Sequence, residues 1–134
     1  MIQWVVPKQL ARSPRPGEGH QPSLKVDVEK WIVEAKTLGI RSIICLLSQQ
    51  ELHEFYYAAK INLFACYREA GFEVEHFPVS DSSTPPRLPE LLVEIGQRYS
   101  ELPKPCLVHC NAGIDRTRRV LDYLLRLEGF TPQA

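Results

Sequence analysis

The stretch CLVHCNAGIDRT, residues 106–117, joins a short apolar run to a turn and to the start of a helix. The apolar run ends at His109 and Cys110, and Arg116 and Thr117 follow after five intervening residues. Apolar residues then recur at helical spacing, at Val120, Leu121, Leu124 and Leu125. These patterns predict a buried strand, a tight loop and a helix beginning near Arg116, in immediate succession.

Strand and helix patterns alternate along the rest of the chain. Strands are predicted where apolar or alternating residues form short runs, over 2–6, 42–47, 73–79 and 106–110. Amphipathic helices are predicted where apolar residues recur every three or four positions, over 28–38, 52–67 and 88–99. Loops are predicted where Pro, Gly and Ser accumulate, over 12–23 and 80–86. The alternation is typical of an α/β fold, here one domain with a largely parallel central sheet flanked by helices.

Two reactive side chains follow predicted strands. Asp81 comes just after the strand over 73–79, and Cys110 ends the last strand. In open α/β sheets, ligands bind beyond the carboxyl ends of the strands. The sequence therefore predicts that Asp81 and Cys110 lie at the same edge of the sheet.

The composition argues against several classes of protein. Sixteen basic and sixteen acidic residues balance, so bulk charge does not support a nucleic-acid partner. No apolar stretch approaches the roughly 18 residues of a membrane span, and the N-terminus lacks the pattern of a secretory signal. The cysteines lie in apolar or helical patterns that favour free thiols, at Cys45, Cys66, Cys106 and Cys110. We expect a monomeric cytoplasmic protein without stable membrane insertion.

The last five residues, FTPQA (130–134), resemble a helix cap followed by a proline at a first helical position. The sequence stops there. For the single domain over residues 1–134 we therefore expect either a truncated C-terminus or a fold that lacks a final C-terminal helix.

The loop after Cys110 has the features of an anion site. Its successive backbone N–H groups form a nest for an anion, at Asn111, Ala112, Gly113, Ile114 and Asp115. The N-terminus of the following helix adds partial positive charge, and the planar guanidinium of Arg116 suits phosphate. The same field favours a thiolate at Cys110, and the Thr117 hydroxyl is spaced to donate a hydrogen bond to that sulfur. The sequence predicts a phosphate-binding loop with a nucleophile at its floor.

His109-Cys110, five residues and Arg116-Thr117 together resemble the signature loop of the protein tyrosine phosphatases, and the short chain resembles their dual-specificity branch. The resemblance implies a phosphate-binding loop between the last strand and a helix, and phosphomonoester hydrolysis through a phosphocysteine intermediate. Cys110 is then the nucleophile, with Arg116 and Thr117 supporting it. Asp81, with prolines behind it, is then the general acid. The implied mechanism needs no metal and no other cofactor.

Three positions bear on the substrate. Asp115 stands where most dual-specificity enzymes have Gly. An Asp at this position is found in relatives that include enzymes active on phosphoinositides. Ile114 replaces the Lys of such lipid-active loops, which favours a phosphoprotein carrying phosphotyrosine, phosphoserine or phosphothreonine. The segment LARSPRP (10–16) resembles the Arg-Ser segment beside the active-site mouth of small bacterial and fungal members, which implies that Arg12 contacts substrate.

Each candidate residue also has a structural interpretation. Cys110 alone would be read as a buried thiol, and His109 is expected to be a buried imidazole that supports the loop. A zinc site from Cys106, His109 and Cys110 lacks a fourth ligand, and adjacent strand residues point to opposite faces. Asp81 is also a plausible turn residue. Asp115 remains open between structural and catalytic roles, and the loop arginines Arg12 and Arg15 are by default solvated.

Other functions fit parts of the pattern. A phosphoinositide phosphatase would use the same loop chemistry, and a phosphate-binding module without turnover would retain Arg116 but lose the nucleophile or the acid. Rhodanese-like and arsenate-reducing enzymes also use a cysteine loop, but their loops usually lack the Arg-Thr ending. Because the nucleophile and a candidate acid are both present, we expect a phosphatase.

Overall fold

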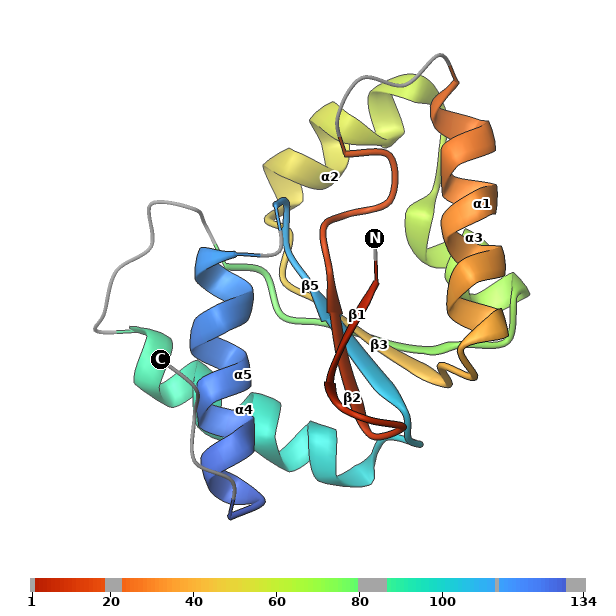
Figure 1. The fold of residues 1–134 in the computed structure, drawn as a ribbon. Helices are drawn as coiled ribbons and strands as arrows, with labels where there is room; N and C mark the ends of the chain where they lie inside the picture. Colours follow the sequence, from red (N-terminus) through yellow and green to blue (C-terminus); the bar gives the residue numbers. More distant parts are fainter. Residues whose placement is uncertain (1, 19–22, 80–86, 113, 130–134) are drawn as a thin grey trace.

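The computed structural model describes residues 2–18, 23–79, 87–112 and 114–129 (Figure 1). The strands are β1 (Gln3–Val6), β2 (Leu10–Ser13), β3 (Ser42–Cys45), β4 (Glu73–His76) and β5 (Cys106–His109). The helices are α1 (Leu24–Thr37), α2 (Gln49–Phe55), the 3-10 helix η1 (Tyr57–Ala59), α3 (Leu63–Glu69), α4 (Arg87–Glu101) and α5 (Asp115–Leu127). Asp81, Gly113 and the segment 130–134 lie outside the described residues.

One five-stranded sheet organises the chain, with its strands in the order β1-β2-β5-β3-β4. Strand β5 lies at the centre and pairs in parallel with both β2 and β3. Strand β4 is parallel to β3, and only β1 is antiparallel to its neighbour. This arrangement confirms the predicted α/β fold with a largely parallel sheet. All four residues of β5 are buried, as a strand covered on both faces requires.

Helices cover both faces of the sheet (Figure 1). Ile43 and Cys45 of β3 belong to a core with α1, α2 and α3, whereas Ile44 faces the core formed with α4 and α5. Alternate residues of one strand therefore serve two cores, as the period of two in a strand dictates. Trp31 and Tyr67 lie in the first core, whereas Trp4 is only partly buried against it.

Strand β2 lies partly in a segment that was predicted to be a loop. Arg12 and Ser13 belong to the strand, which the Pro- and Gly-rich composition of 12–23 concealed. The segment LARS has weak intrinsic strand propensity, but it pairs with β1 on one side and with β5 on the other. Leu10 and Ala11 are fully buried. Tertiary pairing thus overrides the local preference.

The single helix predicted over 52–67 is wrong. Helix α2 ends at Phe55, and the chain passes through η1 to Lys60, whose φ of 62° lies in the left-handed region. Asn62 then caps a new helix by accepting a hydrogen bond from the Ala65 N–H at 3.0 Å. Asparagine competes for backbone donors in this way and so favours a helix start over a helix interior.

The described cysteines are free thiols, with Cys45, Cys106 and Cys110 buried and Cys66 partly exposed, as the sequence predicted. Within the described part of the chain, the helices lack the length and apolar character that crossing a bilayer requires. No cluster of three or more His, Cys, Asp or Glu side chains among those residues is arranged to hold a metal ion.

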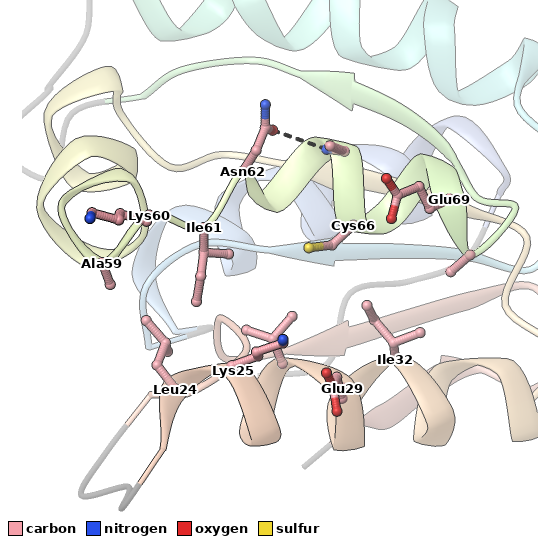
Figure 2. A pocket seen from close by; sticks show the side chains of 13 residues that line it. Leu24, Lys25, Glu29, Ile32, Ala59, Lys60, Ile61, Asn62, Cys66 and Glu69 are labelled. Atoms are coloured by element: carbon pink, nitrogen blue, oxygen red, sulfur yellow. Dashed lines mark hydrogen bonds between the residues drawn. The ribbon is translucent and has the colours of Figure 1, made fainter.

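A groove of about 830 Å³ lies between α1 and the η1–α3 segment (Figure 2). Leu24 and Ile32 of α1 and Ile61 and Cys66 of the facing segment line it, with lysines and glutamates at its rim. None of the candidate residues of the loop after Cys110 lines this groove.

Candidate functional site

The sulfur of Cys110 lies just beyond the carboxyl end of the central strand. Cys110 is 2% exposed and follows the fully buried His109. The hydroxyl of Thr117, on the first turn of α5, donates a hydrogen bond to Cys110 Sγ over 3.1 Å. This is the contact expected from the spacing of the two residues. A donor at this distance stabilises negative charge on the sulfur.

Helix α5 directs its N-terminus toward the same loop. Its N-cap is Ile114, whose side chain makes no capping hydrogen bond. Because an isoleucine side chain has no acceptor, it does not cap this end of the helix, where the positive end of the helix dipole favours an anion. Ile114 is 59% exposed and Ala112 and Asp115 are also exposed, whereas Arg116 and Thr117 of the same turn are buried.

Arg116 is held by a carboxylate from another helix. Its Nη1 donates to Glu51 Oε1 over 2.5 Å and its Nη2 donates to Glu51 Oε2 over 2.9 Å. Nη1 also donates to the carbonyl of Val79 over 2.8 Å. Such a two-point contact fixes the plane of the guanidinium as well as its position.

Glu51 is itself fixed by the start of α2. Ser48 and Glu51 form a capping box: Glu51 N–H donates to Ser48 Oγ over 3.1 Å, and Ser48 N–H donates to Glu51 Oε1 over 2.9 Å. Burial acts to raise the pKa of Glu51, but hydrogen bonds from Arg116 and Ser48 outweigh it, and the pKa lies below its ordinary value. Glu51 was not among the site residues predicted from the sequence. The Ser-x-x-Glu spacing predicts the cap but not the arginine partner.

His109 lies inside the core beside the loop. Its Nδ1 faces the carbonyl of Cys110 at 3.2 Å, and a carbonyl can only accept, so Nδ1 carries the proton. Nε2 then accepts a hydrogen bond from the Tyr67 hydroxyl over 2.8 Å. Burial lowers the pKa of His109 from 6.5 to about 4, and the charges of Arg15 and Arg116 act in the same direction. The imidazole is therefore neutral and supports the loop.

Arg15 contacts the loop from the N-terminal side. Its backbone N–H donates to the carbonyl of Asn111 over 2.8 Å, and its Nε donates to Asn111 Oδ1 over 2.9 Å. From the resemblance of the segment 10–16, Arg12 was the arginine predicted to contact substrate beside the active-site mouth. Arg12 lies in β2 opposite Val108, before the strand reaches the level of the loop. The structure thus brings Arg15 to the loop backbone.

The arrangement combines a nearly buried sulfur, an open helix N-terminus and a fixed guanidinium at one end of the sheet. These are the groups that bind a tetrahedral oxyanion and attack its central atom. The structure brings together Cys110, Asn111, Arg116 and Thr117.

Comparisons with known proteins give a consistent result. The family model described as cyclin-dependent kinase inhibitor 3 (CDKN3) matches residues 11–131. The kinase-associated phosphatase (KAP), solved with its catalytic-site cysteine replaced by serine, has a TM-score of 0.70 and 23% identity over 92% of this chain and 68% of that chain. No curated protein sequence matches this chain.

Other phosphatase structures share the fold at similar identity. The active form of Tk-PTP has a TM-score of 0.58 and 23% identity, over 92% of this chain and 71% of that one. The core catalytic domain of the PP-IP phosphatase SIW14 from S. cerevisiae has a TM-score of 0.59 and 19% identity, over 97% of this chain and 67% of that one.

Removing the carboxylate of Glu51 should destabilise the protein. In Glu51→Ala the buried guanidinium of Arg116 loses its counter-charge, and we expect urea unfolding to report a loss of about 3–5 kcal/mol. The exposed Glu54 of the same helix is the control, and Glu54→Ala should stay within about 0.5 kcal/mol. Adding Arg116→Met to Glu51→Ala should recover at least about 1 kcal/mol. If the losses in the free energy of unfolding of Glu51→Ala and Arg116→Met simply add in the double variant, the two side chains are not energetically coupled.

His109 should make stability depend on pH. Between its ordinary pKa of 6.5 and the folded value of about 4, the unfolded chain binds a proton that the folded protein does not. The free energy of unfolding should therefore fall as the pH drops, by about 2 kcal/mol between pH 7 and pH 5. The free energy of unfolding of His109→Asn, measured by urea unfolding at both pH values, should fall by about 2 kcal/mol less between pH 7 and pH 5 than that of the wild-type protein. His76, whose pKa burial also lowers, is common to both proteins. If the free energy of unfolding falls equally with pH in the two proteins, His109 is not the cause of the pH dependence.

Proposed function

Because this chain belongs to the cyclin-dependent kinase inhibitor 3 family, we propose that it is a cysteine-dependent phosphatase that hydrolyses phosphomonoesters. The observation that carries the proposal is the position of Cys110 Sγ, hydrogen-bonded to Thr117 beside the open N-terminus of α5. The fold, which is that of solved phosphatases, supports it. We propose that residues 1–134 act as one catalytic domain, as a monomer and without a metal or cofactor.

In the proposed first step, the Cys110 thiolate attacks phosphorus. The S–P bond forms, the P–O ester bond breaks, and the leaving oxygen takes a proton from Asp81. Backbone N–H groups of the loop and the guanidinium of Arg116 bind the phosphoryl oxygens. Because Glu51 holds that guanidinium before substrate arrives, little reorganisation is needed in the transition state.

In the second step, water hydrolyses the phosphocysteine. The water oxygen bonds to phosphorus, Asp81 takes the water proton, and the S–P bond breaks to release inorganic phosphate. The leaving sulfur regains its negative charge, which the hydrogen bond from Thr117 stabilises. The hydroxyl of Thr117 thus assists the departure of a thiolate rather than its attack.

Asp81 is proposed as the acid over Asp115. Asp115 is exposed and lies on the first turn of α5, immediately before Arg116. It therefore belongs to the loop and helix segment that binds the phosphate, rather than to a second segment that can approach the leaving oxygen. Asp81 follows the segment of Val79, whose carbonyl accepts from Arg116, so the chain approaches the site immediately before Asp81.

We propose phosphorylated proteins as the substrate class, with phosphotyrosine preferred and phosphoserine or phosphothreonine weaker. The exposed Ile114 supports this order, because an apolar side chain at the rim suits an aromatic ring better than a polyanionic headgroup. The phosphoinositide alternative uses the same loop. A panel of phosphopeptides and phosphoinositides separates the two, and a hundredfold preference for a lipid headgroup would reverse the order.

Replacing the nucleophile should remove turnover but not anion binding. We expect Cys110→Ser to abolish hydrolysis of para-nitrophenyl phosphate while inorganic phosphate still binds in isothermal titration calorimetry. The loop N–H groups and Arg116 remain in this variant, which is why binding persists. Cys66→Ser, at a partly exposed cysteine outside the loop, is the control and should keep full activity. Turnover by Cys110→Ser, or activity lost to EDTA and restored by zinc, would reject the mechanism.

The two aspartates can be separated by leaving-group dependence. Asp81→Asn should slow hydrolysis of phosphotyrosine by about 10²–10⁴, because general acid catalysis is worth that much for a poor leaving group. An activated aryl ester should suffer less, and the basic limb of the kcat profile should flatten. The matched variant Asp115→Asn should change kcat little. If Asp115→Asn shows the larger effect, the acid is the loop aspartate.

A further inference from the structure

We propose that Arg15 places a positive charge without an ion-pair partner beside the anion site and positions the phosphate-binding loop through Asn111. The proposal rests on the proposed function for its kinetic consequences, whereas its electrostatic part concerns the reactivity of Cys110 alone. Arg15 is then a positioning residue that also attracts the anionic substrate.

The first support is the contact set of Arg15. Its backbone N–H and its Nε reach the carbonyl and side-chain oxygens of Asn111, over 2.8 and 2.9 Å. Its guanidinium stacks on the Phe55 ring, 4.0 Å from the ring centroid. Two hydrogen bonds to one residue and a stacked aromatic ring leave the arginine little freedom. Since Asn111 directly follows Cys110, Arg15 fixes the first residue of the loop.

The segment that carries Arg15 is anchored on both sides. Before it, the Ser13 hydroxyl accepts a hydrogen bond from the Trp31 indole N–H over 2.9 Å. After it, the carbonyl of Pro16 accepts from the Tyr56 hydroxyl over 2.5 Å. Trp31 and Tyr56 are core residues of α1 and of the α2–η1 junction. The position of Arg15 is therefore determined by the core rather than by the loop that it contacts.

The second support is the charge balance of the site. Arg116, the arginine of the loop motif, shares its charge with the Glu51 carboxylate at two points, so the pair adds little net charge. The polar partners of Arg15 are neutral, namely Asn111 and the Pro16 carbonyl. Among the described residues, no carboxylate forms an ion pair with it. Arg15 thus brings to the loop a positive charge that is not paired with any described carboxylate.

The charge of Arg15 already acts on its surroundings. After burial, the charges of His76, Arg15 and Arg116 act to lower the pKa of His109, which precedes Cys110. At an effective dielectric constant near 20, a unit charge about 12 Å from a singly charged anion changes the local concentration of that anion by about tenfold. The same field attracts a phosphate dianion that approaches Cys110. It also attracts any anionic reagent that reacts with the sulfur of Cys110.

Alkylation of Cys110 by two reagents tests the charge. Iodoacetate is an anion and iodoacetamide is neutral, so the ratio of their rates at one pH reports the local potential. The rates are followed by mass spectrometry of the peptide that contains Cys110, which separates it from the partly exposed Cys66. We expect Arg15→Met to lower the iodoacetate-to-iodoacetamide ratio about tenfold. Arg15→Lys, which keeps the charge, should restore most of it.

The control is Arg126→Met, at an exposed arginine in the last turn of α5, which should leave the ratio unchanged. If Arg15→Met changes both rates equally, or Arg15→Lys does not restore the ratio, the charge role is overturned. Arg15→Gln serves as a second neutral variant, and thermal unfolding confirms that each variant is folded.

Kinetics test the positioning part. Arg15→Lys cannot reproduce the Nε contact to Asn111, so it should retain KM for para-nitrophenyl phosphate while kcat falls several-fold. Arg15→Met should raise KM as well. A wild-type kcat in Arg15→Lys would reject positioning. If the wild-type protein hydrolyses no phosphomonoester, the proposed function fails, yet the alkylation ratio still decides whether Arg15 supplies the charge.

Discussion

The ion pair between Arg116 and Glu51 is the contact on which the arrangement of the site depends. It joins the first turn of α5 to the first turn of α2, and the Val79 carbonyl ties the end of the β4 segment to the same guanidinium. A buried ion pair gains little net stability over an apolar contact of similar size, but it tolerates only one geometry. The pair therefore determines where the guanidinium points more than how stable the protein is.

Helix α2 carries no reacting group, yet it holds both arginines of the site. Glu51 and Phe55 are four residues apart and so lie on one side of the helix. Glu51 pairs with Arg116, and Phe55 stacks on Arg15, which comes from the opposite end of the chain. A helix of seven residues thus sets the relative position of two charges that are far apart in sequence. Its capping box fixes the register of both contacts.

The central part of the fold could be predicted because its signals are local. An apolar run before Cys110 and helical spacing after Arg116 are sufficient to place β5 and α5. Strand β2 was not predictable, because its weak propensity is overcome by pairing with β5, about a hundred residues later in the chain. The break at Lys60 and the partnership of Glu51 were missed for related reasons. Lys60 adopts a left-handed backbone conformation that the sequence usually signals by a glycine, and no glycine is present. The ion pair joins residues far apart in the chain, so no sequence spacing reveals it.

The order of strands has a consequence for how the protein is made. Strand β5 is synthesised after the other four strands of this sheet, yet it lies between β2 and β3 and pairs with both. Until Cys106–His109 leaves the ribosome, the β1–β2 and β3–β4 pairs of the nascent chain each have an open edge and no shared partner. Closing the sheet must wait for the strand that delivers Cys110. A molecule whose sheet has closed has therefore also brought Cys110 to the end of the sheet where the site lies, and the docking of α5 then adds Arg116 and Thr117.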